Sequence, residues 1–458
     1  MRVLAVLIVA VLVAALPAGS VAADKSSPNM TLVKNLPYEA RNGTTPNFGT
    51  DIEFANIAGR KYALAGSYMN GMQIVDITSA RAAQIAAVYD CGVTQGDVQV
   101  FRQADKPGRV FAGYTSDTEG DGTSTCYREA EALGFNVKKP DGTGKNGTFI
   151  VELTNPTAPK TVSFVEVAQG SHNHTIHPSG RYLYNSNSDL INSFLPAIEV
   201  FDISNFAAPV KVTELDLPTR PGLGTESHDI TFSSDGNRAY SAALSQGVII
   251  DTSQARAPKI VSSWLDPAIN VWHQSDPVTI GGRKFVLVED EFAGAAGGPV
   301  CPSGGFHVYE VTGEMEKAPQ KVGYWNIDDV GLTNNLAGTC TAHVFDIHQR
   351  EQVLTVAYYN GGVRVVDLSG LATGEGMRQI GMYQTENADS WSAKTPSVDA
   401  NGSFWLFGND MARGLDVYRF DGTKPESASG GTWLGAQAAL SLPAAPRTGT
   451  NYVCLIQS

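Results

Sequence analysis

Short stretches of alternating apolar and polar residues run along most of the chain, which is the period-two pattern of β-strands with one buried face. Within them, a segment of the form small–x–x–apolar–apolar–acidic recurs about every 50 residues, a spacing typical of propeller blades. The fourth copy is one residue shorter than the others, and the last ends in Arg419 instead of an acid. The seven copies begin at Gly71, Gly147, Ala197, Gly247, Gly305, Gly362 and Gly414.

A second recurring piece precedes these segments. Residues 228–236 (HDITFSSDG) alternate up to an Asp-Gly pair, and residues 238–243 (RAYSAA) alternate again after it. Asp-Gly is a favoured hairpin turn, so the two pieces predict a pair of antiparallel strands. With the acidic-ended strand and one more after it, each unit offers four strands. The sequence therefore predicts an all-β fold, a seven-bladed β-propeller of four-stranded blades, because two β-sandwiches would not repeat one motif seven times.

The last repeat lacks an outer strand, since no clear strand follows Asp421. Residues 31–36 (TLVKNL) precede the first repeat and have the alternation of a strand. We expect this N-terminal strand to complete the last blade, which closes the ring and hides both sheet edges. The propeller is accordingly assigned to residues 24–421, and residues 422–458, rich in Ala, Gly, Ser and Pro, to a C-terminal extension.

Residues 1–23 have the parts of a secretory signal peptide. Arg2 is followed by an apolar run over residues 3–16, and small residues lie directly before Asp24. The run is short for a bilayer span, which favours a cleaved signal over an uncleaved membrane anchor. We therefore expect a secreted, extracellular protein with no transmembrane anchor in the mature chain.

Composition and charge narrow the function classes. The chain has 458 residues, of which 42% are hydrophobic, enough for a packed core. Its formal net charge is -13 and it contains no Lys/Arg run, which excludes nucleic acid as a partner. The sequence also has no phosphate-binding loop, serine-nucleophile elbow or HExxH zinc motif, so those enzyme classes have no support and the catalytic residues stay unknown.

Five cysteines fit an oxidising compartment. Two pairs are plausible from their places in the repeats, Cys91 with Cys126 and Cys301 with Cys340, and Cys454 is left over. Each disulfide would close a loop at the end of a blade.

Several strings resemble the LVIVD-repeat family of secreted propellers, namely residues 74–78 (IVDIT), 155–159 (NPTAP) and 365–369 (VVDLS). Others are similar to the related choice-of-anchor B proteins, namely residues 272–274 (WHQ) before 289–292 (EDEF), and His343 before 359–367 (YNGGVRVVD). The resemblance extends over residues 48–421. It implies a propeller and export, and it implies no particular activity. Unlike the anchored group, this sequence shows no membrane or sorting segment in its last residues.

One position repeats across the blades when their first strands are aligned by the turn glycine. The histidines at this position lie eight residues before the turn, and the second blade has three extra residues. The seven positions hold Asp51, Asp97, His172, His228, His273, His343, and either Ser392 or Lys394.

The first strand of each blade lies nearest the axis, so these side chains should gather around one mouth of the central channel. Neutral imidazoles bind Cu, Fe and Zn, and nearby carboxylates orient the rings. We therefore expect one transition-metal ion, Cu, Fe or Zn, with His174 as an alternate ligand because it shares a strand face with His172. The expected metal ligands are His172, His228, His273 and His343, and the expected pocket residues are Asp51, Asp97, Glu289, Asp290 and Lys394.

Three functions fit these features. The first is an exported binding protein whose His-rich pocket holds a metal ion or an unidentified small ligand. The second is a Cu- or Fe-dependent oxidase or oxygenase that uses the four histidines. The third is a non-catalytic scaffold for a cell-surface or other protein partner, in which the histidines make purely structural hydrogen bonds.

Overall fold

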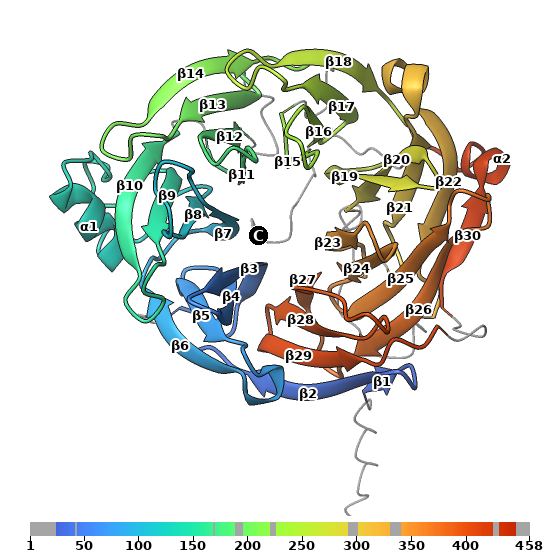
Figure 1. Ribbon diagram of the computed structural model, residues 1–458, viewed down its shortest axis with the longest axis horizontal. Helices are drawn as coiled ribbons and strands as arrows, with labels where there is room; N and C mark the ends of the chain where they lie inside the picture. Colours follow the sequence, from blue (N-terminus) through green and yellow to red (C-terminus); the bar gives the residue numbers. More distant parts are fainter. Residues whose placement is uncertain are drawn as a thin grey trace, which may run out of the picture.

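The computed structural model describes residues 24–41, 44–167, 170–187, 196–219, 226–291, 301–329, 340–424 and 430–445. The expected signal peptide, residues 1–23, lies outside these ranges, as does Cys454. In the described parts of the chain, strands form seven antiparallel sheets arranged as blades around a central axis (Figure 1). The prediction of a seven-bladed β-propeller is confirmed.

The blades follow the chain in order around the ring, and the strands of each blade run from the axis outward. Blade 1 has β3 (Gly49–Ile57), β4 (Arg60–Ser67), β5 (Met72–Asp76) and β6 (Gln84–Tyr89). Blade 2 has β7 (Gln95–Phe101), β8 (Phe111–Ser116), β9 (Gly147–Glu152) and β10 (Lys160–Glu166). Blade 3 has β11 (Asn173–Ile176), β12 (Tyr182–Ser186), β13 (Ile198–Asp202) and β14 (Val210–Leu215). Blade 4 has β15 (Asp229–Phe232), β16 (Arg238–Ala243), β17 (Gln246–Asp251) and β18 (Lys259–Trp264).

The last three blades include strands from both ends of the chain. Blade 5 has β19 (Trp272–Ile280), β20 (Arg283–Asp290), β21 (Phe306–Glu310), β22 (Gln320–Asn326) and β30 (Thr432–Gly435). Blade 6 has β23 (His343–His348), β24 (Val353–Ala357), β25 (Val363–Gly370), β26 (Gly376–Gln384) and β1 (Lys25–Ser26). Blade 7 has β27 (Ser390–Lys394), β28 (Phe404–Asp410), β29 (Gly414–Phe420) and β2 (Met30–Leu36). The described helices are α1 (Thr125–Ala132), α2 (Ala436–Ala439) and the 3-10 turns η1 (Ala80–Ala82) and η2 (Gly313–Lys317).

The recurring acidic-ended segment is the third strand of each blade, and an ion pair explains its last residue. The start of the second strand lies opposite the end of the third, as in the Arg238–Asp251 register pair. Arg283 accordingly pairs with Glu310 at 2.5 Å, and Arg181 pairs with Asp202 at 2.9 Å. The acid therefore pairs within its blade, while the apolar residues before it are buried between blades.

The N-terminal strand closes the ring, as predicted. β2 pairs with β29 in an antiparallel register from Met30 opposite Phe420 to Leu36 opposite Leu415. Two further outer strands, β1 on β26 and β30 on β22, are not predicted by the repeat. The Trp433 indole of β30 lies where a Cβ at Gly323 or Gly376 would clash. Because both residues are glycines, blades 5 and 6 leave room for this ring.

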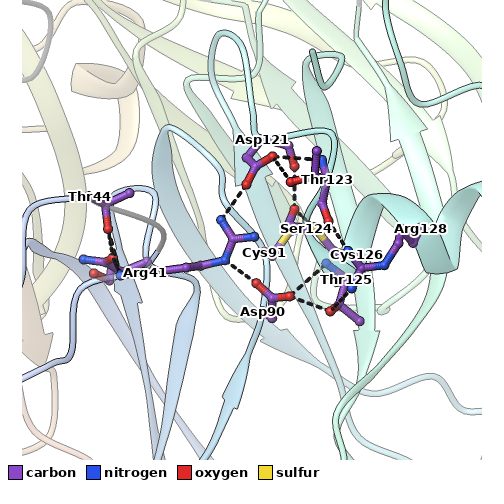
Figure 2. Close-up of polar contacts among 12 residues, drawn as sticks. Arg41, Thr44, Asp90, Cys91, Asp121, Thr123, Ser124, Thr125, Cys126 and Arg128 are labelled. Carbon is purple, nitrogen blue, oxygen red and sulfur yellow. Dashed lines mark hydrogen bonds and ion pairs between the residues drawn. A yellow bond between two sulfur atoms is a disulfide. The ribbon is translucent and has the colours of Figure 1, made fainter. Parts of the chain in front are cut away.

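Both expected disulfides are present, Cys91 with Cys126 and Cys301 with Cys340. Cys126 lies on α1, which is inserted between β8 and β9 of blade 2. Beside this disulfide, the Arg41 guanidinium contacts the carboxylates of Asp90 and Asp121 (Figure 2). The N-terminal segment is thereby held to the junction of blades 1 and 2.

The residues that the structure describes include no helix of the length and apolarity needed to span a bilayer.

Candidate functional site

Some of the inner strands bring their aligned positions to the axis through irregular pairing. The β19–β20 ladder shifts register between Trp272 and Gln274, and the β23–β24 ladder shifts between His343 and Phe345. Such bulges place two consecutive residues opposite one and re-aim their side chains. As a result, neighbours such as His273 and Gln274 both line the central cavity.

Four imidazoles from consecutive blades lie in contact with one another. The ring centroids are 4.3 Å apart for His172 and His228, 4.2 Å for His228 and His273, and 4.3 Å for His273 and His343. All four side chains are buried. The structure therefore brings together the four histidines that the sequence analysis aligns.

Each of these rings is held by its Nδ1 atom. His228 donates from Nδ1 to the carbonyl oxygen of His273 at 2.9 Å, and His343 to that of Trp391 at 2.6 Å. Nδ1 of His273 lies 2.5 Å from Glu289 Oε2, and Nδ1 of His172 lies 3.0 Å from Asp117 Oδ2. Such outer acceptors fix the tautomer and orientation of an imidazole ligand.

The opposite nitrogens of two rings have no hydrogen-bond partner. The Nε2 atoms of His228 and His343 are buried and make no hydrogen bond. Burial and the neighbouring imidazoles lower the pKa of His228 well below its ordinary value, and burial lowers the pKa of His343 to about 3. Both rings are therefore neutral at pH 7, and because a carbonyl accepts from Nδ1–H, each Nε2 carries a free lone pair.

A carboxylate completes a group of potential metal ligands. The donor atoms of His273, Glu291 and His343 all lie within 4.8 Å of one another. The Tyr359 hydroxyl donates to Glu291 Oε1 at 2.6 Å. Burial, with a contribution from Asp290, raises the pKa of Glu291 to about 8. Among the described residues, this is the group of three that could hold a metal ion.

The other expected pocket residues take different roles. The Lys394 ammonium pairs with Asp51 at 2.8 Å. Asp97 pairs with Nδ1 of His174 at 2.9 Å, and the Nε2 atom of His174 is packed against Gly113, apart from the four-histidine ring. Asp290 accepts hydrogen bonds from the backbone at Asn270 and Val271. In the acidic run 289–291, Glu289 thus contacts Nδ1 of His273, and Glu291 belongs to the group of potential metal ligands.

Four residues around the histidines lie outside the aligned positions. Glu291 follows β20, and only its alternation with Glu289 places it on the same side. The other three come from loops or from the next blades, where no repeat signal marks them. These four residues are Asp117, Glu291, Tyr359 and Trp391.

A cavity of about 330 Å³ lies along the axis beside His273 and His343. It continues toward the ends of the inner strands, where a second hollow shares Thr231, Asp276 and Asp346 with it. Its lining is mainly polar and acidic. The ligand group is therefore adjacent to a space that can admit a small molecule.

These features define the class of the protein as a seven-bladed β-propeller with a histidine-lined central channel. No protein-family model and no curated protein matches the chain. Among solved structures it is similar to the β-propeller domain of Cps50 (Swd1) from Myceliophteria thermophila. The two share 11% sequence identity with a TM-score of 0.51, over 85% of this chain and 99% of that one. At this identity the likeness shows the fold alone.

Proposed function

We propose that this protein is an exported β-propeller that binds one transition-metal ion in its central channel, through His273, Glu291 and His343. The observation that carries the proposal is the set of buried, neutral imidazoles of His228, His273 and His343. Their Nδ1 atoms are fixed, and the Nε2 atoms of His228 and His343 have no hydrogen-bond partner. Buried polar atoms are normally paired. A metal ion bound by this group would satisfy the Nε2 atom of His343 and replace the proton on Glu291.

The charge of the site supports a cation in the same place. The carboxyls of Glu289 and Glu291 are both buried, and both lie against His273, at 2.5 and 3.6 Å. Burial and each other's charge raise the pKa of Glu289 well above its ordinary value. A divalent cation would stabilise such a buried pair of carboxyls, because the imidazole between them is neutral and offers no positive charge.

The ligand set favours an oxidase or oxygenase as a second candidate function. Two imidazoles and one carboxylate with open positions are the ligand set of many non-haem Fe(II) oxygenases. The cavity beside His343 offers room for a substrate. Oxygen consumption by the iron-loaded protein with added substrates would distinguish this activity from metal binding alone.

Export and relationship to the LVIVD-repeat propellers belong to the same proposal. The apolar N-terminal segment and the recurring strings support it, and the two disulfides are compatible with an extracellular protein. Detection of the mature chain, cut near residue 24, outside the cytoplasm of an expressing cell would test the export.

Metal content tests the binding function. The exported mature chain is loaded separately with Cu, Fe and Zn, and the bound metal is measured by mass spectrometry and titration calorimetry. We expect one ion per chain, and a loss of more than about 100-fold in affinity in the His273→Ala/His343→Ala variant. His177→Gln is the matched control, because His177 lies in a turn where it bonds Ser179 and Gly236. Equal binding by the double variant and the wild type would contradict the proposal.

A further inference from the structure

The cavity beside the histidines has a strongly acidic lining. Among the described residues, six carboxyl side chains line it together with one lysine, Lys394. The six are Asp51, Glu53, Asp97, Asp229, Asp276 and Asp346. The excess of carboxyl groups over basic groups favours a cation as the occupant of the cavity.

Four of the six carboxylates already have a basic partner. Lys394 bridges Asp51 and Glu53, at 2.8 and 2.9 Å. Asp97 pairs with His174, and Asp346 pairs with His348 at 3.1 Å. These carboxylates are therefore part of the folded structure of the channel wall.

Asp229 and Asp276 differ from the others, because no basic side chain in the described parts of the chain pairs with either. Asp229 accepts a hydrogen bond from the backbone of Ile230 at 2.7 Å. Asp276 accepts from the Thr231 hydroxyl at 2.6 Å and from the Gln274 amide at 3.3 Å. All of the donors are neutral, so two acidic groups on the neighbouring strands β15 and β19 face the cavity without a paired counter-charge.

A second observation points to a ligand in this cavity. The imidazole of His343 lines it, is fully buried, and has no hydrogen-bond partner at Nε2. Apolar side chains alternate with the acids in the lining, among them Phe232 and Phe345. The cavity thus offers acidic groups, an imidazole lone pair and apolar surface to one occupant.

The spacing of the acids argues for an organic cation rather than a metal ion. Hard metal ions need several oxygen ligands converging on one point. In the part of the chain that the structure describes, the only three such groups that converge are His273, Glu291 and His343, which lie at the end of the cavity. The carboxyl groups along the cavity wall come from several blades and do not converge on one point. This arrangement suits a flexible organic ligand that carries several separate positive charges.

We infer that the central cavity binds a linear aliphatic polyamine, with ammonium groups at Asp229 and Asp276 and methylene groups against Phe232 and Phe345. Ammonium groups would complete the charge of the two carboxylates, and a volume of about 330 Å³ is large enough for a short chain. In the metal-free protein, an amine end that reaches His343 would donate to its Nε2 atom. The inference goes beyond the proposed function and does not require that the metal be bound.

Titration calorimetry with spermidine tests the inference, using the exported mature chain before and after chelator treatment. We expect one spermidine per chain and a loss of at least about 10-fold in affinity in Asp229→Asn/Asp276→Asn, since each pairing of charged groups is lost. Asp216→Asn/Glu375→Gln removes the same charge from exposed positions and should bind as the wild type. The single variants Asp229→Asn and Asp276→Asn, with thermal melting curves, check that the fold is kept.

The outcomes separate this inference from the metal site. Spermidine binding that survives His273→Ala/His343→Ala, while metal binding is lost, supports the polyamine site independently of the metal. Absence of spermidine binding to the wild type, or unchanged affinity in Asp229→Asn/Asp276→Asn, would overturn it. Magnesium ions that displace spermidine at equal charge concentration would instead assign the cavity to inorganic cations and also overturn it.

Discussion

The histidine nitrogens explain why the site is suited to a metal ion. Each of the four rings uses Nδ1 for an outer acceptor, so its orientation does not depend on an occupant of the channel. The neutral state of His273 follows from burial and from the neighbouring imidazoles, which lower its pKa well below the ordinary value. Preorganised neutral imidazoles of this kind would lose little entropy on binding a metal ion.

Replacing the carboxylate tests its place in the ligand group. Glu291→Gln keeps the size of the side chain and the contact with Tyr359 but removes the anionic ligand. We expect metal affinity to fall by about 10- to 100-fold, with no decrease in melting temperature, because a buried acid is removed. Calorimetric titration with Zn²⁺ measures the change, and Glu375→Gln, at an exposed position, is the control. Wild-type affinity in Glu291→Gln would show that Glu291 is not a ligand.

At this scale the sequence predicts part of the site. Counting from the turn glycine finds the four histidines, because each blade repeats the same strand and turn. It does not find Glu291, since its contribution depends on where the chain leaves β20 rather than on the repeat. It also cannot separate His172 from His174, because residues two apart in a strand share the same face and alternation alone assigns both to the channel.

Among the elements, the N-terminal strand is the one on which ring closure depends. Met30 of β2 is buried in a cluster with Phe404 and Phe420 of blade 7. Met30→Ala should therefore lower the free energy of unfolding by about 2–4 kcal/mol, as measured by urea denaturation. Thr31→Ala, on the exposed side of the same strand, should change it by less than about 0.5 kcal/mol. Equal effects of the two substitutions would mean that β2 is not packed as the structure has it.

The Arg41 contacts at the junction of blades 1 and 2 give a pH-dependent stability (Figure 2). Burial raises the pKa values of Asp90 and Asp121, but hydrogen bonds from threonines and from Arg41 outweigh it and lower both. Carboxyls with lowered pKa stabilise the fold above the unfolded value near pH 4, and this stabilisation is lost as the pH falls through their folded pKa values.

Arg41→Gln should accordingly destabilise the protein by about 1 kcal/mol at pH 7. The difference from the wild type should shrink as the pH falls below about 4. Urea denaturation at pH 7, 5 and 3 measures it, and Arg350→Gln, on an exposed side chain, is the control. A difference that stays constant down to pH 3 would contradict the assigned role of the two carboxylates.

For the whole molecule, the repeat predicts more than the composition does. The seven copies of the repeat specify the number of blades. The N-terminal strand β2 supplies the outer strand that blade 7 lacks, and the two disulfides join the cysteine pairs expected from the repeats. The outer strands β1 and β30 are not predicted, because they pair with blades 6 and 5 by contacts between segments far apart in the chain. Trp433 of β30 illustrates this, because its indole packs against a glycine of blade 5 and a glycine of blade 6, which no pattern near Trp433 in the sequence indicates.

The most direct test of the metal site is the position of the ion in crystals of the loaded protein. Anomalous scattering measured at the absorption edges of Cu, Fe and Zn locates each metal without reference to the protein chain. The account predicts one peak in the channel at about 2.0–2.3 Å from the Nε2 atoms of His273 and His343 and from an oxygen of Glu291. A peak elsewhere, or no peak in crystals grown with a stoichiometric excess of each metal, would contradict it.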